Sequence, residues 1–406
     1  MINWRAVLAL VLGVPGAAFA WTYSPLTTVS ELTQPRMFQH LESSGNRSIA
    51  ISESIVAVTW EDNRSGQPAA YIAFKTQGAA QFTPATRLSE TGPAYEPALA
   101  GLPDGRFIVV WEASDHVWGR VVNTEQLGPV RQLSSAPARE ATITTSKAGQ
   151  IWLAWAEKAG PHYRIVSSTA SLKADRIQLS DAMPVDPAPP KQDQLYPSIA
   201  LTRDGTIISW EDRRYGHTRL FTAHAAHGEA FTPLRQLNQL KAKRSATFGM
   251  GTGAMRTVLA SDGQSRIFSC WLDKRDFAEG YDVYAAFSQD AGKTFGQNLK
   301  VEDLLGANQA QWHAVSAMDN QGHSVVAWDD QRDGSPDIWM SWFMANGWSD
   351  DDSPSGTNGK GSQSHPAMVF DNQGRLHMAF LDREPGKTAI RYLVATPSPD
   401  QFGQTP

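Results

Sequence analysis

The sequence predicts an all-β fold, a seven-bladed β-propeller built of four-stranded antiparallel blades. Three observations lead to this prediction. An apolar run ending in an aromatic residue recurs seven times, turn residues divide each unit into four short β-forming runs, and the N-terminal segment matches a strand that the last unit lacks. A repeat of about 40 to 50 residues with four strands per unit is typical of propellers. A ring of six blades is the alternative count.

The repeat is clearest at residues 60–66, 210–216 and 328–334, where a Trp is followed by Asp-x-Arg and a closing Gly. The seven aromatic anchors are Trp60, Trp111, Trp155, Trp210, Trp271, Trp328 and Phe380. The arginines that follow five of them could form a ring that binds an anionic ligand; these are Arg64, Arg214, Arg275, Arg332 and Arg383. Alternatively, each Asp caps its own turn and neutralises its own Arg. Repetition favours this structural interpretation, because one ligand site has no need of five copies.

The second unit shows how each blade is divided. Residues 97–100, 106–111, 117–122 and 130–133 form four β-rich runs, and the first two are separated by a Pro-Asp-Gly turn. The last unit stops after its third run, whereas residues 23–31 resemble the fourth run of the first unit, residues 82–90. We therefore expect a strand within residues 21–35 to complete the last blade and close the ring, which removes an open sheet edge. The propeller domain would span residues 21–396, followed by a tail at 397–406.

The first twenty residues are predicted to be a signal peptide. Arg5 precedes an apolar stretch at residues 6–14, and Ala18-Phe19-Ala20 fits a cleavage site. No later apolar run is long enough to span a membrane, so we expect an exported chain, periplasmic or secreted. The formal net charge of −5 offers no basic surface for nucleic acid. Cys270 is the single cysteine, which excludes an intrachain disulfide, and we expect a monomer.

Residues 288–295, Ser-Gln-Asp-Ala-Gly-Lys-Thr-Phe, fit the Asp-box pattern between the third and fourth strands of the fifth blade. With its repeats, the chain resembles the sialidase-like (BNR/Asp-box) β-propeller superfamily, in particular its exported bacterial members. In the box itself, Asp and Ser are expected to satisfy the turn backbone. The resemblance implies a carboxylate-binding arginine, for which Arg47 is the candidate. It also implies a nucleophilic Tyr with a Glu partner, for which Tyr196 with Glu96 or Glu140 are the candidates.

A second set of candidates opens the innermost strand of each blade, near the mouth of the central channel. These residues differ between blades, as a specific site requires; they are Asn46, Glu96, Glu140, Tyr196, Ala254 or Met255, His313 and His365. Two histidines from neighbouring blades could bind a metal or act as acid and base, or could simply be solvated polar residues. The predicted ligand-binding residues are Arg47, Glu96, Glu140, Tyr196, His313 and His365.

No cofactor and no metal ion are predicted. The acidic residues 350–352 could hold Ca²⁺, but a flexible acidic loop is the simpler interpretation. Trp312, Trp342 and Trp348 are not strand anchors, so each could stack on a sugar, although burial is the expectation for all three. Two functional hypotheses remain. The chain binds a glycan, a peptide or a cell-envelope partner on its loop face, or it hydrolyses terminal acidic sugars as an exo-sialidase does.

Overall fold

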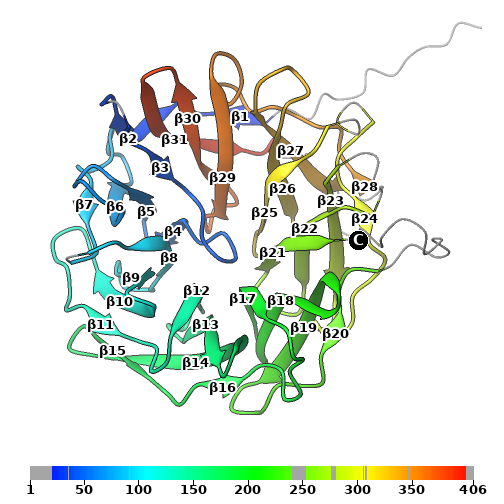
Figure 1. Cartoon of the computed structure of the whole chain (residues 1–406). Coiled ribbons are helices and arrows are strands. Elements are labelled where there is room, and N and C mark those ends of the chain that lie inside the picture. Colours follow the sequence, from blue (N-terminus) through cyan, green and yellow to red (C-terminus); the bar gives the residue numbers. More distant parts are fainter. Residues whose placement is uncertain are drawn as a thin grey trace, which may run out of the picture.

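The computed structural model describes residues 21–34, 36–90, 92–239, 253–275, 280–304, 306, 309–344 and 347–398. Within these ranges the regular structure is entirely β, arranged as seven antiparallel sheets around a central axis (Figure 1). The first strands of neighbouring blades contact one another around the ring, and the last of them reaches the first. The predicted seven-bladed propeller is therefore confirmed. The described residues include no helix long and apolar enough to cross a membrane.

Each blade runs from an inner strand at the axis to a short outer strand. Blade 1 comprises β3 (Gln39–His40), β4 (Ile49–Ser52), β5 (Ile55–Asp62), β6 (Ala69–Thr76) and β7 (Thr86–Arg87). Blade 2 comprises β8 (Tyr95–Gly101), β9 (Phe107–Ala113), β10 (His116–Val122) and β11 (Arg131–Gln132). Blade 3 comprises β12 (Ala138–Thr145), β13 (Ile151–Ala159), β14 (His162–Lys173), β15 (Arg176–Leu179) and β16 (Met183–Pro184).

The remaining blades follow the same order. Blade 4 comprises β17 (Gln194–Thr202), β18 (Gly205–Tyr215), β19 (His217–Ala226) and β20 (Arg235–Gln236). Blade 5 comprises β21 (Ala254–Ser261), β22 (Ile267–Asp273), β23 (Asp282–Ser288) and β24 (Leu299–Lys300). Blade 6 comprises β25 (Trp312–Met318), β26 (Ser324–Asp330), β27 (Asp337–Met344) and β28 (Gly347–Trp348). Blade 7 comprises β29 (Ser362–Phe370), β30 (Leu376–Glu384) and β31 (Lys387–Thr396).

Blade 7 is completed by the N-terminal segment, as the sequence predicts. Strands β1 (Thr22–Tyr23) and β2 (Thr27–Leu32) both pair antiparallel with β31, with Thr22 opposite Thr396 and Thr27 opposite Tyr392. Trp21 and Val29 are buried beside this pairing. The ring is thus closed by joining the two ends of the chain in one sheet (Figure 1). The predicted signal peptide lies outside the described residues.

The anchors of the repeat lie in the core between blades. All seven are fully buried, and four tryptophans donate their indole N–H to the Asp two residues later: Trp60 to Asp62 (2.7 Å), Trp210 to Asp212 (3.3 Å), Trp271 to Asp273 (3.0 Å) and Trp328 to Asp330 (3.0 Å). In these four units the same carboxylate binds the Arg of its own turn, as in Arg332–Asp330 at 2.6 Å. The structural interpretation of these four Asp-x-Arg pairs is therefore confirmed. Blade 7 differs, since Arg383 donates to the backbone oxygen of Gln39 (3.1 Å) instead.

The Asp-box turn is held by its own side chains. Asp290 accepts hydrogen bonds from the Thr294 amide (2.9 Å) and hydroxyl (2.7 Å), and the Ser288 hydroxyl accepts one from the Gly292 amide (2.9 Å). Phe295 packs against two clusters of the core. These contacts make the box a turn-stabilising device, as expected from its residues.

Candidate functional site

A left-handed backbone residue near the start of each inner strand defines the candidate site. The seven residues with this conformation are Asn46, Glu96, Glu140, Tyr196, Arg256, His313 and His365, with φ between 46° and 57°. In blades 2 to 7 each lies within a shift of register, a β-bulge. Positive φ is uncommon for residues other than Gly, and bulges redirect side chains near functional sites. Because the left-handed conformation recurs in all seven blades, it is a regular part of the architecture at the channel mouth.

Six of these seven residues are those the sequence predicts. The exception is blade 5, where the structure places Arg256 at the bulge in place of Ala254 or Met255. Ala254 and Met255 pair regularly with Asp273 and Leu272, and the register shift begins only after them. The sequence-based prediction was therefore one or two residues too early in blade 5, where no Pro after the bulge residue marks its position, as Pro97, Pro197 and Pro366 do in blades 2, 4 and 7.

Carboxylates from the preceding blade hold most of the bulge amides. In four blades the backbone amide of the bulge residue donates a hydrogen bond to a carboxylate. The pairs are Glu96 to Glu61 (3.4 Å), Arg256 to Glu211 (2.8 Å), His365 to Asp329 (3.0 Å) and Glu140 to Glu112. Each of these four acids directly follows the Trp anchor of its blade. In blade 3, Ala156 replaces the acid, and Glu140 accepts from the Tyr196 amide instead (2.6 Å). The sequence analysis did not predict that these acids bind the bulge amides, although an acid directly after the Trp is a visible part of the repeat.

In blade 1 the bulge is enlarged into a loop of residues 41–48 between β3 and β4, here called the plug loop. It reaches across the axis toward the opposite blades (Figure 1). Ser44 donates to the Pro197 oxygen (2.7 Å) in blade 4, and Asn46 donates to the Pro366 oxygen (3.1 Å) in blade 7. The tip, Gly45, has φ of 67°, and a Cβ there would lie only 3.0 Å from the hydroxyls of Thr142 and Ser198. The plug loop therefore lines the cavities at both ends of the channel.

The cavity at the start of the inner strands, here called the mouth pocket, has a volume of about 220 Å³. Its lining includes Glu42, Asn46, Glu96, Tyr196, Arg256, Trp312, His313 and His365. Of the predicted residues, Glu96, Tyr196, His313 and His365 thus converge on one pocket, and Glu140 is bonded to the Tyr196 backbone beside it. Trp312 is 40% exposed, which corrects the expectation that it is buried, whereas Trp342 is buried and Trp348 half-buried.

Arg47 lies apart from the other predicted residues. It lines the second cavity, of about 410 Å³, at the far end of the inner strands, and its guanidinium donates to the Ile199 oxygen (2.5 Å). Burial lowers the pKa of Arg47 to about 10. The arginine that the structure brings to the mouth pocket is Arg256. Its guanidinium lies 3.4 Å from the centre of the Tyr196 ring and 3.4 Å from Glu42.

The mouth pocket is rich in carboxyl groups whose protonation is perturbed. Burial raises the pKa of Glu96 to about 7, with a further contribution from Glu42 and Glu140. Burial likewise raises the pKa of Glu140 to about 7 and that of Glu112 to about 8. For Glu42, burial opposes ionisation, but bonding to His40 and the charge of Arg256 outweigh it and lower the pKa to about 2. Burial and pairing thus move the pKa values of neighbouring carboxyl groups in opposite directions.

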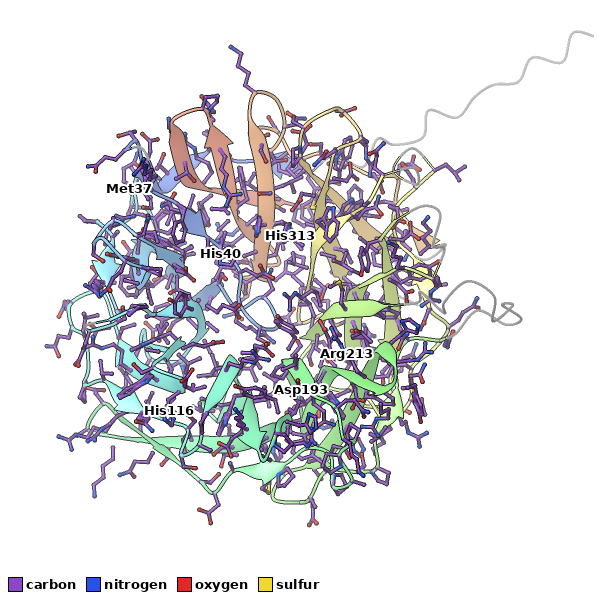
Figure 2. The ribbon with its side chains drawn as sticks, viewed as in Figure 1. Met37, His40, His116, Asp193, Arg213 and His313 are labelled. Atoms are coloured by element: carbon purple, nitrogen blue, oxygen red, sulfur yellow. The ribbon has the colours of Figure 1, made fainter. Side chains whose placement is uncertain are left out.

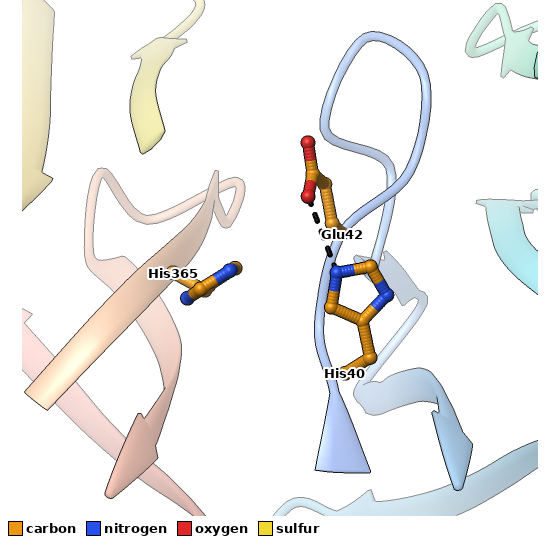
Figure 3. A group of neighbouring side chains, drawn as sticks. All are labelled: His40, Glu42 and His365. Carbon is orange, nitrogen blue, oxygen red and sulfur yellow. Dashed lines mark hydrogen bonds and ion pairs between the residues drawn. The ribbon is translucent and has the colours of Figure 1, made fainter. Parts of the chain in front are cut away.

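Three histidines complete the site. His313 and His365 stack with ring centres 3.5 Å apart, and the His40 ring meets His365 edge-on at 5.8 Å. Figure 2 shows His40 and His313 on the inner side of the ring, whereas His116 lies at its periphery. His40 also contacts Glu42 at 3.2 Å (Figure 3). Sequence reasoning missed His40 and Glu42, which precede the first recognised inner strand, and it placed the blade 5 residue one or two positions before Arg256.

The acidic loop serves the fold. Asp351 pairs with Arg332 (2.8 Å), and Asp352 accepts a hydrogen bond from the Tyr23 hydroxyl (2.5 Å), which ties blade 6 to the N-terminal strands. Asp351 and Asp352 thus have structural partners in the surrounding blades.

Comparisons with known proteins found distant structural similarity only. No protein-family model matches the sequence, and no curated protein matches it. An α-L-arabinofuranosidase from Fusarium graminearum is similar over 73% of this chain and 91% of its own, with 12% identity and a TM-score of 0.48. A protein of unknown function from Dyadobacter fermentans covers 92% of this chain and 99% of its own, with 10% identity and a TM-score of 0.48. A leech intramolecular trans-sialidase is similar over 95% of this chain and 71% of its own, with 9% identity and a TM-score of 0.45. Likeness at this level does not extend to activity.

Proposed function

We propose that the chain is an exported binding module that takes the end of a glycan, a neutral or amino sugar, into the mouth pocket. The observation that carries this proposal is Trp312, a large aromatic side chain left 40% exposed on the rim of a pocket lined by carboxyl, amide and imidazole groups. Sugars present apolar ring faces and many hydroxyls, which such a combination matches. Export is part of the proposal, and N-terminal sequencing of the mature protein would test it.

The size and floor of the pocket favour a terminal sugar over an extended chain. Its volume of about 220 Å³ lies below the roughly 300–1,000 Å³ typical of sites for drug-sized ligands. The plug loop lines the pocket and is tied to blade 4, so it limits how far a ligand can pass along the channel. Asn46 offers a buried side-chain oxygen that has no hydrogen-bond partner among the described residues. A rotation of the Asn46 side chain would let this oxygen accept a hydrogen bond from a hydroxyl of the ligand.

The charges argue for a neutral or amino sugar. Glu42 and Glu96 line the pocket, and Glu61, Glu211 and Asp329 stand directly behind the bulges. Arg256, the arginine of the pocket, is already engaged by Glu42 and Glu211. A sugar carboxylate would have to compete with these acids for one guanidinium, which disfavours an acidic sugar.

Removal of the Trp312 ring tests this proposal. Screening the protein on a glycan array, followed by calorimetry with the best ligand, should show saturable binding that Trp312→Ala weakens about tenfold, which corresponds to about 1.4 kcal/mol. Tyr215→Ala is the matched control, because Tyr215 is 61% exposed but does not line the pocket. Equal affinity in wild type and Trp312→Ala, or an array without any binder, would refute the proposal.

A second candidate function is hydrolysis of a glycoside at the same pocket. It is favoured by the convergence of Tyr196, Glu96 and Glu140, the residues expected for a catalytic pair. Aryl glycosides, including a sialoside, distinguish the two functions. Turnover that Glu96→Gln or Tyr196→Phe abolishes would establish the enzyme, whereas binding without turnover supports the binding module.

A further inference from the structure

The three side chains drawn in Figure 3 form a cluster in which only Glu42 also enters the argument for the proposed sugar. His40 from β3, Glu42 from the plug loop and His365 from β29 each offer one ligand atom, and these atoms lie within 4.8 Å of one another. The residues come from the first and last blades, so the cluster forms only where the ring closes. A second group shares His365 and adds His313 and Asp329.

The contacts of each ring nitrogen fit metal coordination. The Nδ1 atom of His365 lies 2.9 Å from the Ser364 hydroxyl, and the Nδ1 atom of His40 lies 3.9 Å from Glu61. Metal-bound histidines usually have their second nitrogen held by a polar group or a carboxylate, which orients the ring; the Ser364 contact does this for His365, and Glu61 is the nearby carboxylate for His40. The Nε2 atoms of His40 and His365 are thereby left as the coordinating atoms.

Glu42 is oriented for the same purpose. Its Oε1 faces the Arg256 guanidinium at 3.4 Å, and its Oε2 faces Nε2 of His40 at 3.2 Å. Two ligands bound to one Zn²⁺ at about 2.0–2.1 Å in tetrahedral geometry are roughly 3.3 Å apart, so the His40–Glu42 pair already has the required spacing. A modest rotation of His365 would complete the set.

We propose that His40, Glu42 and His365 bind one divalent transition-metal ion of the Zn²⁺ type. Two imidazoles and one carboxylate form a three-ligand site that leaves a fourth position open. Because Glu42 and His365 line the mouth pocket, this open position faces the space where a ligand enters. The proposal revises the sequence-based prediction of no metal ion. It is independent of the proposed function, since the ion binds with or without a sugar.

Metal binding can be measured directly on untagged full-length protein that has been dialysed against a chelator. Calorimetry with Zn²⁺ alone should show one site per chain, and Co²⁺ should give the visible absorption of a tetrahedral complex. Glu42→Gln and His365→Ala should each weaken binding at least tenfold. His323→Ala is the control, because His323 makes a comparable contact with Asp319 (2.8 Å) outside the cluster.

Thermal unfolding separates lost binding from lost structure. Excess Zn²⁺ should raise the Tm of wild type and of His323→Ala, because an ion that binds only the folded chain stabilises it. It should raise the Tm of Glu42→Gln clearly less than that of wild type at the same Zn²⁺ concentration, although that isosteric variant folds. Wild type that takes up no Zn²⁺, or folded variants that bind it as wild type does, would overturn the proposal and would leave the saccharide measurements unaffected.

Discussion

At the scale of the residue, the site is defined by where the blades differ. Seven bulge positions share one backbone conformation, but their side chains are different in most blades. The shared part is supplied by acids such as Glu61, Glu211 and Asp329, which hold amide groups and whose position is fixed by the buried Trp before them. A constant scaffold thus presents variable side chains, which is how propellers and other rigid folds accommodate specific sites on loops and strand ends.

Glu112 allows a pH-dependent prediction at this scale. It faces Glu96, Glu140 and Arg139, and burial raises its pKa to about 8 from an ordinary value of 4.5. Between these two values the folded chain holds a proton that the unfolded chain releases. The resulting stability is complete below pH 4.5 and is lost as the pH rises through 8. Between pH 4.5 and pH 8, the titration of Glu112 therefore lowers the free energy of unfolding by up to about 1.4 kcal/mol for each unit by which the pH rises.

Glu112→Gln should therefore flatten the pH dependence of stability. Gln can still accept a hydrogen bond from the Glu140 amide, but it cannot titrate, and its neutrality removes the charge interaction between Glu112 and Glu96. Denaturant unfolding between pH 6 and pH 8 should show a smaller loss of stability in this variant than in wild type. Glu125→Gln, a substitution at an exposed glutamate, should follow the wild type. Parallel curves for Glu112→Gln and wild type would contradict the assignment.

At the scale of the element, the plug loop connects the fold to the site. It replaces a two-residue bulge by eight residues, and it supplies Glu42 and Asn46 to the mouth pocket and Arg47 to the far cavity. The sequence predicted Asn46 as a strand-opening residue but did not predict the loop. Its crossing depends on Ser44 and Asn46 bonding to blades 4 and 7, contacts between positions far apart in the chain. Such contacts leave no periodic signal.

Substitution of Gly45 tests the packing of this loop. A Cβ at Gly45 would lie 3.0 Å from the hydroxyls of Thr142 and Ser198, at a φ of 67°. Gly160 is the matched control, since it has a φ of 65° and nothing within 4 Å of its Cβ position. Both Ala variants carry the cost of left-handed backbone, about 1–2 kcal/mol, but Gly45→Ala also crowds the channel, which typically adds about 1–3 kcal/mol.

Denaturant unfolding should therefore rank Gly45→Ala below Gly160→Ala in stability. Ligand binding at the mouth pocket should weaken in Gly45→Ala alone, because the displaced loop carries Glu42 and Asn46. If the two variants lose the same stability and both bind as wild type does, the plug loop does not shape the pocket.

At the scale of the whole molecule, the architecture was predictable and the site only partly so. The buried Trp anchors, the turns and the strand-like N-terminus are local signals, and they sufficed for seven blades and their closure. The convergence of Tyr196, Glu96, His313 and His365 followed from aligning the inner strands. Arg256 was not predicted because its position depends on a register shift, and His40 was not predicted because it precedes a loop that crosses the axis. Such three-dimensional features are not encoded in the period of the repeat.

The closure of the ring carries the last prediction. Deletion of residues 21–34 removes β1 and β2, exposes the edge of β31 and uncovers core that Trp21, Val29 and Leu32 now bury. Three buried apolar side chains contribute about 1.5–3 kcal/mol each, which is comparable to the net stability of about 5–15 kcal/mol of a typical domain. The truncated chain should therefore aggregate or melt far below wild type.

A synthetic peptide of residues 21–34 should restore the monomer and its Tm, because β31 offers the same hydrogen bonds to a strand supplied in trans, whereas a scrambled peptide should not. An unchanged Tm for the truncated monomer would show that the ring needs neither the N-terminal strands nor their pairing with β31.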